Sequence, residues 1–285
     1  MTPRPFMPTS LRQQRPLPWA RRLGTGLLWL SAIGSAGAQS FEVAVSPSRY
    51  ELSGKSQARI GQTLTLHNLG ANASDVALRT LDWSYTESGQ VSYHEELLEG
   101  SCRPWVALER KTLKLPARQA VSFRFQINVP ADTPRRECRF MLAVEGIEPA
   151  YRALLEGGGL NLSLPVSGRI AVAVYLSVNG AQPELEIKAL TVIELDGRRQ
   201  PVVVVHNRGD AHGRLEGALE AVDATRQAFE LQPEGTPILP GQTRTLPLSP
   251  RKEPHLPPPQ VKMPFEVDGV LEWERGAFKI KATLS

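Results

Sequence analysis

Acidic residues are missing from the first part of this 285-residue sequence, where none occurs before Glu42. The whole chain has a formal net charge of +4, which alone would suggest binding to nucleic acid or another anionic surface. However, residues 1–38 hold five arginines, and the remaining 28 Lys and Arg are balanced by 29 Asp and Glu. The positive charge therefore belongs to residues 1–38, and we expect no nucleic-acid partner.

The sequence also lacks an apolar run long enough to cross a membrane comfortably. Its most apolar stretch, residues 23–33, follows the basic pair Arg21–Arg22 and leads to small residues that end at Ala38. A basic, then an apolar, then a small-residue segment is typical of a secretory signal peptide. We predict a signal peptide over residues 1–38, cleaved after Ala38, and an exported protein without stable membrane insertion. The alternative is an uncleaved N-terminal anchor.

Cysteine is scarce, since the chain contains only Cys102 and Cys138. Their spacing is not the Cys-x-x-Cys of redox proteins, no histidine cluster accompanies them as in zinc sites, and nothing marks a catalytic thiol. An even pair of cysteines in an exported protein forms a disulfide by default. If the chain is exported, we therefore predict a structural disulfide between Cys102 and Cys138.

Motifs for enzyme chemistry are missing as well. The segment His94–Glu96 lacks the second histidine of a zinc-protease helix, and Gly54–Ser56 lacks the glycine that a phosphate loop requires. The sequence has no Gly-x-Ser-x-Gly segment. His206, Asp210 and His212 lie near a turn, where such residues are more often solvated than metal-bound. We expect no enzymatic activity, no metal and no cofactor.

In place of helical periodicity, the chain after residue 38 shows short runs that alternate apolar and polar residues. The clearest runs are residues 41–45, 62–67, 121–127 and 139–144. Turn-forming pairs such as Asp196–Gly197 separate the runs, and the chain contains 23 Gly and 24 Pro. This pattern predicts an all-β protein built from β-sandwiches.

A weak internal repeat indicates that there are two sandwiches. Leu64–Gly70 resembles Val203–Gly209, and each segment runs from a strand into an Asn-x-Gly turn. Further along, Leu115–Gln119 resembles Leu239–Thr243. The repeat predicts two related sandwich domains in tandem. The alternative is chance similarity, because Asn-x-Gly turns are common.

The join between the two domains is expected where Asn179–Gly180 interrupts an apolar run. After the signal peptide over 1–38, we therefore predict an N-terminal domain over residues 39–178 and a C-terminal domain over residues 179–285.

A leucine-rich segment precedes this join, after a hinge-like run at Glu156–Gly159. Its alternating apolar residues, which would share one face of a strand, are Leu160, Leu162, Leu164 and Val166. Pro165 has no backbone donor, so this strand should be an edge strand or an irregular one. It is either a final strand whose leucines face their own core, or a platform that completes the unfinished sheet of another chain.

Several segments of the first domain follow one another in an informative order. They are Val45–Leu52, Leu64–Gly70, Leu113–Pro116 and the leucine-rich segment that leads to Arg169–Val172. This order resembles that of the periplasmic pilus-assembly chaperones of the chaperone-usher pathway, over roughly residues 41–178. No single motif carries the resemblance, and the second domain is similar in size and class alone.

The resemblance implies two immunoglobulin-like domains and a location in the periplasm. It implies a chaperone that binds pilus or fimbrial subunits and delivers them to an outer-membrane usher, with no cofactor. The leucine-rich segment would be the donor strand, whose apolar side chains fill the groove of a subunit that lacks one strand. The alternative function is an exported structural or accessory protein of a pilus or adhesion system, with the leucines buried in its own core.

The resemblance also implies two cations that anchor the terminal carboxylate of the subunit. Arg49 matches the basic residue of the family on the first strand. The family's lysine, near the end of the first domain, falls on Ala171 here, while Arg169 lies two residues earlier on the same strand face. We therefore expect Arg49 and Arg169 to form the carboxylate anchor. For each arginine, the alternative is a surface salt bridge.

Overall fold

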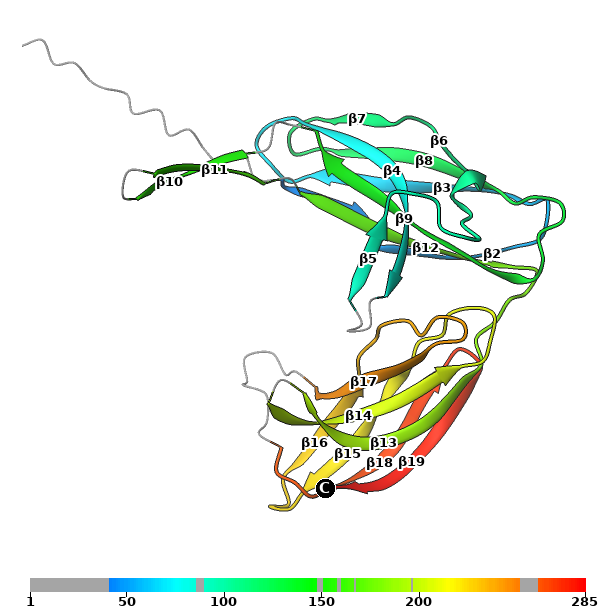
Figure 1. The fold of residues 1–285 in the computed structure, drawn as a ribbon, viewed down its shortest axis with the longest axis vertical. Coiled ribbons are helices and arrows are strands. Elements are labelled where there is room, and N and C mark those ends of the chain that lie inside the picture. Colours follow the sequence, from blue (N-terminus) through cyan, green and yellow to red (C-terminus); the bar gives the residue numbers. More distant parts are fainter. Residues whose placement is uncertain are drawn as a thin grey trace, which may run out of the picture. The chain divides into compact units, whose positions relative to one another are not determined.

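The computed structural model describes residues 41–85, 90–147, 151–157, 160–166, 168–195, 197–251 and 261–285, with the backbone alone for those between 151 and 166 and for 195. These residues form strands β1 to β19 and one short 3-10 helix, η1 (Arg103–Trp105), as Figure 1 shows. No helix in these segments is long and apolar enough to cross a membrane. The predicted all-β class is confirmed, whereas the predicted signal peptide lies outside the described residues.

The first sandwich consists of two sheets. One sheet has the order β1-β3-β8-β6, with β1 (Val43–Ser46), β3 (Arg59–Asn68), β8 (Ala120–Asn128) and β6 (Val106–Leu108). The other has the order β2-β12-β9-β4-β5, with β2 (Arg49–Gly54), β12 (Arg169–Val178), β9 (Arg136–Gly146), β4 (Ser74–Tyr85) and β5 (Val91–His94), and β7 (Thr112–Leu115) pairs with β4. The four predicted runs fall on β1, β3, β8 and β9.

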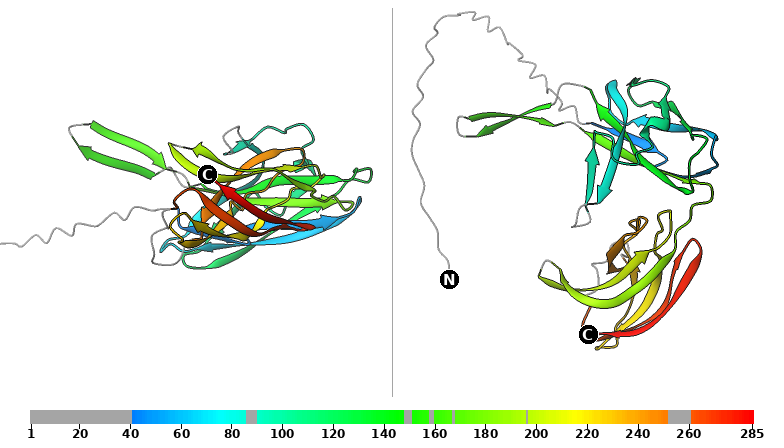
Figure 2. Two further views of the ribbon diagram at one scale, coloured as in Figure 1. Left: turned by 90° about the horizontal axis from the view of Figure 1, so that it is seen from below. Right: turned by 45° about the vertical axis from the view of Figure 1, so that its right-hand side comes forward.

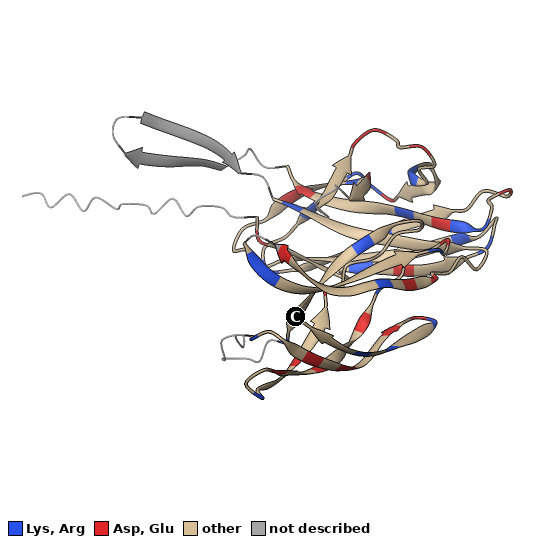
Figure 3. Ribbon diagram, turned by 60° about the horizontal axis from the view of Figure 1, so that its bottom comes forward, with Lys and Arg blue, Asp and Glu red and all other residues tan. Residues whose placement is uncertain are grey.

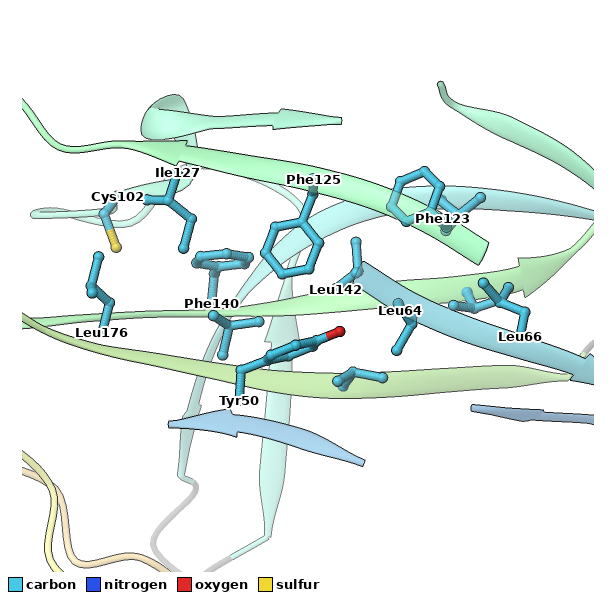
Figure 4. Packing of buried hydrophobic residues seen from close by; sticks show 14 of the residues in the cluster. Tyr50, Leu64, Leu66, Cys102, Phe123, Phe125, Ile127, Phe140, Leu142 and Leu176 are labelled. Carbon is cyan, nitrogen blue, oxygen red and sulfur yellow. The ribbon is translucent and has the colours of Figure 1, made fainter. Parts of the chain in front are cut away.

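Alternating apolar residues of both sheets fill the core of the first sandwich (Figure 4). On β8, Phe123, Phe125 and Ile127 are buried, whereas the residues between them are exposed. The ring of Phe125 packs edge-on against Tyr50 and Phe140, with centroid distances of 5.3 and 6.5 Å. The period-two pattern of the sequence thus becomes one buried and one solvated face of the strand.

The predicted disulfide between Cys102 and Cys138 is confirmed. It lies in the core of the first sandwich and joins the residue before η1 to strand β9. The two cysteines are 36 residues apart, and closing a loop of that length stabilises a fold by about 4 kcal/mol in the chain-entropy model.

The second sandwich is built from seven strands in one hydrogen-bonded path with its own core. Its strands, in the order of the path, are β13 (Leu185–Leu195), β14 (Arg198–Asn207), β17 (Thr243–Pro250), β16 (Ala228–Pro233), β15 (Glu216–Asp223), β18 (Phe265–Trp273) and β19 (Gly276–Leu284). Residues 243–247 of β17 pair with β14, whereas residues 248–250 pair with β16. Strand β17 therefore connects the two layers, whose inward side chains meet in one core.

A buried asparagine organises the turn after β3 in the first sandwich. The side chain of Asn68 donates from Nδ2 to the carbonyl oxygens of Asn72, at 2.8 Å, and Leu115, at 3.0 Å. Its Oδ1 accepts a hydrogen bond from the backbone N–H of Gly70 at 2.9 Å. One amide thus satisfies three backbone groups and ties two neighbouring loops together.

The second sandwich repeats this arrangement after β14. Asn207 is fully buried, and its Nδ2 donates to the carbonyl oxygens of Ala211 and Ile238, both at 2.8 Å. Its Oδ1 accepts from the backbone N–H groups of Gly209, at 2.9 Å, and Glu184, at 3.1 Å. The repeat predicted from the Asn-x-Gly turns therefore has a common structural cause.

The second pair of repeat landmarks needs a correction of one residue. The sequence alignment matches Leu115 with Leu239, but the carbonyl equivalent to that of Leu115 belongs to Ile238. Sequence similarity follows the Leu-Pro pairs, whereas the hydrogen bond from the buried asparagine fixes the true equivalence.

Replacing Asn207 with alanine should lower the free energy of unfolding by about 2–4 kcal/mol, because two carbonyls and two N–H groups would lose their partner. Urea unfolding measures the loss. Arg208→Ala is the control, since it removes a surface ion pair with Glu184 at 2.7 Å and should cost less than about 1 kcal/mol. An equal loss in both variants would contradict the structural role of Asn207.

Candidate functional site

Strand β12 has an open edge beside the first residue of β2. On one side, β12 pairs with β9 along its whole length, from Arg169 to Val178. On the other side it pairs with β2 in parallel, and this pairing begins only at Ala173, opposite Arg49. Within the described chain, no strand pairs with residues 169–172 on that side. Four residues of β12, or roughly 13 Å of strand, are therefore open for backbone pairing.

The parallel pairing of β2 gives this open edge a direction. A strand added beside residues 169–172 in the same direction as β2 would run in line with β2 and stop where β2 starts. Its last residue, with the terminal carboxylate, would then lie next to Arg49. An antiparallel strand would place its N-terminus there instead. The geometry thus suits a parallel strand that ends with a carboxylate.

Strand β11 directly precedes β12 in the sequence. Strands β10 (Tyr151–Gly157) and β11 (Leu160–Val166) pair with each other in antiparallel register and form a two-stranded sheet of their own (Figures 1 and 2). Strand β11 ends three residues before Arg169. Its second edge has no partner among the described strands, so β11 and the start of β12 both offer an unpaired edge.

The predicted donor residues Leu160, Leu162, Leu164 and Val166 all belong to β11. The strand and its free edge agree with the sequence pattern, while the side chains lie outside the described part, so the role of the four residues stays a prediction. The hinge expected at Glu156–Gly159 is partly wrong. Glu156 and Gly157 are the end of β10, which the sequence analysis missed, and they pair with Asn161 and Leu160.

Arg49 projects from β2 with about half of its side chain, 51%, exposed. Its Nε lies 3.1 Å from Oε1 of Glu51, two residues along the same face. Glu51 also faces two cations of the second sandwich. Its Oε2 lies 3.3 Å from Nε2 of His212, and its Oε1 lies 3.8 Å from Nε of Arg214. Arg49 therefore belongs to an ion-pair group that spans both sandwiches.

Arg169 belongs to a different group. Its Nε pairs with Oε1 of Glu145, the residue directly opposite on β9. Glu145 is also held by Arg79 through two hydrogen bonds of 2.9 and 3.0 Å, and Arg79 pairs with Glu95. Arg169 lies four residues before Ala173, the partner of Arg49, which is roughly 13 Å along the strand. The structure thus brings Arg49 and Arg169 onto neighbouring strands but not onto a shared partner.

An apolar cluster separates the two ion-pair groups on the face of the sheet opposite the core. It comprises Leu81, Trp83, Met141, Ala143 and Tyr175 with Leu239 of the second sandwich, and Tyr85, Ala171 and Ala173 pack against it. The guanidinium of Arg244 lies 4.1 Å from the ring centroid of Tyr85. Ala171, where the resemblance places the family's lysine, is therefore part of an apolar surface.

His212 joins the two sandwiches. Its imidazole stacks on the ring of Tyr175 at a centroid distance of 3.9 Å, and its Nδ1 lies 2.5 Å from Oε2 of Glu137 on β9. The backbone N–H of His212 donates to the same oxygen at 2.8 Å. Only 7% of His212 is exposed, so the expectation of a solvated residue is wrong. The second nearby acid, Asp210, pairs with Arg135 of the first sandwich at 2.6 Å.

The two carboxylates control the charge of His212. Burial alone would lower the pKa of His212, but the hydrogen bonds and charges of Glu137 and Glu51 raise it to about 9. Burial would likewise raise the pKa of Glu51, but the hydrogen bond from His212 and the charges of His212, Arg214 and Arg49 lower it. His212 is therefore an imidazolium at neutral pH, held between the carboxylates of Glu137 and Glu51.

Sequence reasoning missed this group because its members are far apart in the chain. Glu51 lies on β2, Glu137 lies on β9, and His212 and Arg214 lie together before β15, so three distant segments form the group and no local pattern connects them. The distribution of charged residues does not indicate this group either, since acidic and basic residues are mixed over both sandwiches (Figure 3). The described residues contain no group of three or more His, Cys, Asp or Glu that could hold a metal ion.

No protein-family model matches the chain, and no curated protein matches it. Solved structures do match. The YadV chaperone is 11% identical over 85% of this chain and 100% of its own, with a TM-score of 0.45. A chain of the CsuC–CsuE chaperone–tip adhesion subunit pre-assembly complex, from archaic chaperone-usher Csu pili of Acinetobacter baumannii, is 13% identical over 85% and 97%, with a TM-score of 0.44.

A chain of the complex between the SafA pilin and the SafB chaperone of Salmonella enterica is also similar. It is 13% identical over 86% of this chain and 98% of its own, with a TM-score of 0.42. The three TM-scores lie below 0.5, and the fold described above stands on the strand pairing and the two cores of this chain itself.

The charge of His212 should make stability depend on pH in a defined window. Because its folded pKa of about 9 exceeds the unfolded value of about 6.5, its stabilisation is complete below pH 6.5 and is lost as the pH rises to 9. The loss should be on the order of 3 kcal/mol, measured by urea unfolding between pH 6 and pH 9.5.

His212→Gln should abolish this dependence, whereas the control His206→Gln, at a surface histidine, should keep it. The contribution of Glu51 to stability changes with pH in the opposite direction. Because its pKa is lowered in the fold, its contribution should be lost as the pH falls below about 4.5. A wild-type protein whose stability is flat between pH 6 and pH 9.5 would contradict the buried imidazolium.

Proposed function

We propose that this protein is a periplasmic chaperone that binds pilus or fimbrial subunits by donating a strand and delivers them to an outer-membrane usher. The observation that carries the proposal is the open edge of β11 and β12 that leads in parallel to Arg49. A groove-bearing subunit requires such an edge, because strand addition satisfies backbone groups and pockets accept alternate side chains.

In this mechanism the subunit brings a sandwich that lacks one strand. Strand β11 fills the gap with Leu160, Leu162, Leu164 and Val166, which would contribute about 6–12 kcal/mol before the cost of ordering. The last strand of the subunit runs parallel to β12, and its terminal carboxylate binds Arg49 through charge-assisted hydrogen bonds. No nucleotide or other cofactor is needed, since displacement of the donor strand by another strand releases the subunit.

The disulfide supports the proposed compartment. Disulfides such as Cys102–Cys138 persist in oxidising compartments and are rare in the cytosol. We propose that residues 1–38 direct export and are removed, and that the working chain consists of domains 39–178 and 179–285. The two separate cores, drawn from residues 41–178 and 185–284, support this division.

Arg49→Glu should abolish the co-purification of a subunit from the periplasm while the protein stays folded, because the terminal carboxylate would face a negative charge. The chain that co-purifies with the wild-type protein, identified by mass spectrometry, should be an immunoglobulin-like sandwich that lacks a strand. Arg59→Glu, at an exposed arginine of β3, is the matched control and should retain the subunit. Unchanged co-purification with Arg49→Glu would rule out the anchor.

Leu162→Asp separates the chaperone from the alternative of an accessory protein. For a donor strand, the variant should fold with an unchanged thermal midpoint and fail to bind a subunit, since the aspartate cannot enter an apolar groove. Ser163→Asp, on the other face of the strand, should bind normally. If Leu162→Asp instead unfolds the protein, the leucines belong to its own core and the donor role fails.

A further inference from the structure

The carboxylate of Glu51 sits between two arginines of different sandwiches. Its Oε1 lies 3.1 Å from Nε of Arg49 and 3.8 Å from Nε of Arg214, while its Oε2 faces Nε2 of His212 at 3.3 Å. One carboxylate oxygen therefore belongs to the two arginines, and the other belongs to the histidine. The pair of guanidinium groups already holds a carboxylate, which belongs to the protein itself.

Positive charge is in excess around this carboxylate. Arg49, His212 and Arg214 all face Glu51, and the only other acid of the group, Glu137, is paired with His212 and lies 3.8 Å from Arg139. Two carboxylates thus stand against four cations. Such an excess in a partly buried site favours the binding of a further anion.

The guanidinium of Arg214 is held in position by its neighbours. Its Nη1 donates to the carbonyl oxygen of Gly235 at 2.8 Å, its guanidinium lies 5.6 Å from the ring centroid of Tyr175, and 11% of its side chain is exposed. Its Nε is buried and has no hydrogen-bond partner among the described residues. A buried N–H without an acceptor costs free energy, which a closer carboxylate oxygen would recover.

Glu51 can leave the two arginines without losing all its partners. If the carboxylate of Glu51 turns away from the two arginines to admit a second carboxylate, one of its oxygens can still contact His212, which is itself held by Glu137. About half of the Arg49 side chain is exposed, so a ligand can reach it from solvent. Arg169 lacks this property, because its partner Glu145 is already held on both oxygens by Arg79.

We propose that Arg49 and Arg214 form the carboxylate-binding subsite, and that Glu51 is a resident carboxylate which the terminal carboxylate of a bound partner strand replaces. This inference rests on the proposed function for the identity of the ligand. It assigns the second cation to the second sandwich in place of Arg169. Carboxylate binding is then a competition, in which the terminal carboxylate of the partner strand must displace the side-chain carboxylate of Glu51.

The test is an NMR titration of the full mature protein with sodium acetate, observing the arginine Nε–Hε resonances at constant ionic strength. Acetate should shift the resonances of Arg49 and Arg214 with a common midpoint and leave that of Arg169 in place. Sodium chloride at matched ionic strength should produce no saturable shift.

The decisive variant is Glu51→Gln, which removes the competitor at nearly constant shape. It should lower the acetate midpoint by about tenfold, the effect of one charge-assisted hydrogen bond. Glu145→Gln, which removes the corresponding partner of Arg169, is the matched control and should leave the midpoint unchanged. Arg49→Gln, at a half-exposed side chain, should abolish the saturable shift of Arg214, and Arg214→Lys should raise the midpoint.

Two results would overturn the inference. One is an acetate midpoint that is the same in Glu51→Gln and the wild type, and the other is a saturable shift at Arg169 that Glu145→Gln strengthens. The titration uses no subunit, so it is independent of the proposed function. Acetate binding at Arg49 and Arg214 without any retained subunit would refute the function alone. Loss of subunit in Arg49→Glu with an unchanged midpoint in Glu51→Gln would refute the subsite alone.

Discussion

The parallel pairing between β2 and β12 begins at Arg49 and Ala173, and the placement of the candidate site depends on that starting point. Because β2 starts late, the first four residues of β12 keep a free edge. Because β2 is parallel, an added strand that follows the same direction ends beside Arg49. The backbone register thus decides at once where a partner strand would lie, how it would run and which side chain would meet its carboxyl end.

The second sandwich takes part in this site through His212 and Arg214. The imidazolium of His212 lies between Glu137 and Glu51 and stacks on Tyr175, so one buried residue ties strands β2, β9 and β12 to the second sandwich. A buried charge of this kind costs desolvation free energy, which two carboxylates offset. Its consequence for function is that the partners of Arg49 are set by residues of both sandwiches.

Sequence patterns predicted those parts of the molecule that depend on local order. The alternation of buried and exposed residues along β8 follows from the sequence of that strand. The repeat was visible in the sequence at Asn68 and Asn207, because each turn needs the same buried amide. The disulfide was predicted from two premises, the even number of cysteines and the expected export of the chain. Strand β10 and the Glu51–His212 group were missed, since β10 ends inside the glycine run that was read as a hinge and the group assembles from three distant segments. Long-range pairing is a property of the fold, which no spacing in the sequence encodes.

The central claim is that residues 160–166 and residues 169–172 each offer an unpaired edge to a partner strand. Amide hydrogen exchange of these residues, measured with and without a bound pilus subunit, tests it directly. If the claim is right, every second amide along each edge slows when the subunit binds, because alternate N–H groups of a strand point to the same side. Unchanged exchange at these amides in a protein that holds a subunit would contradict it.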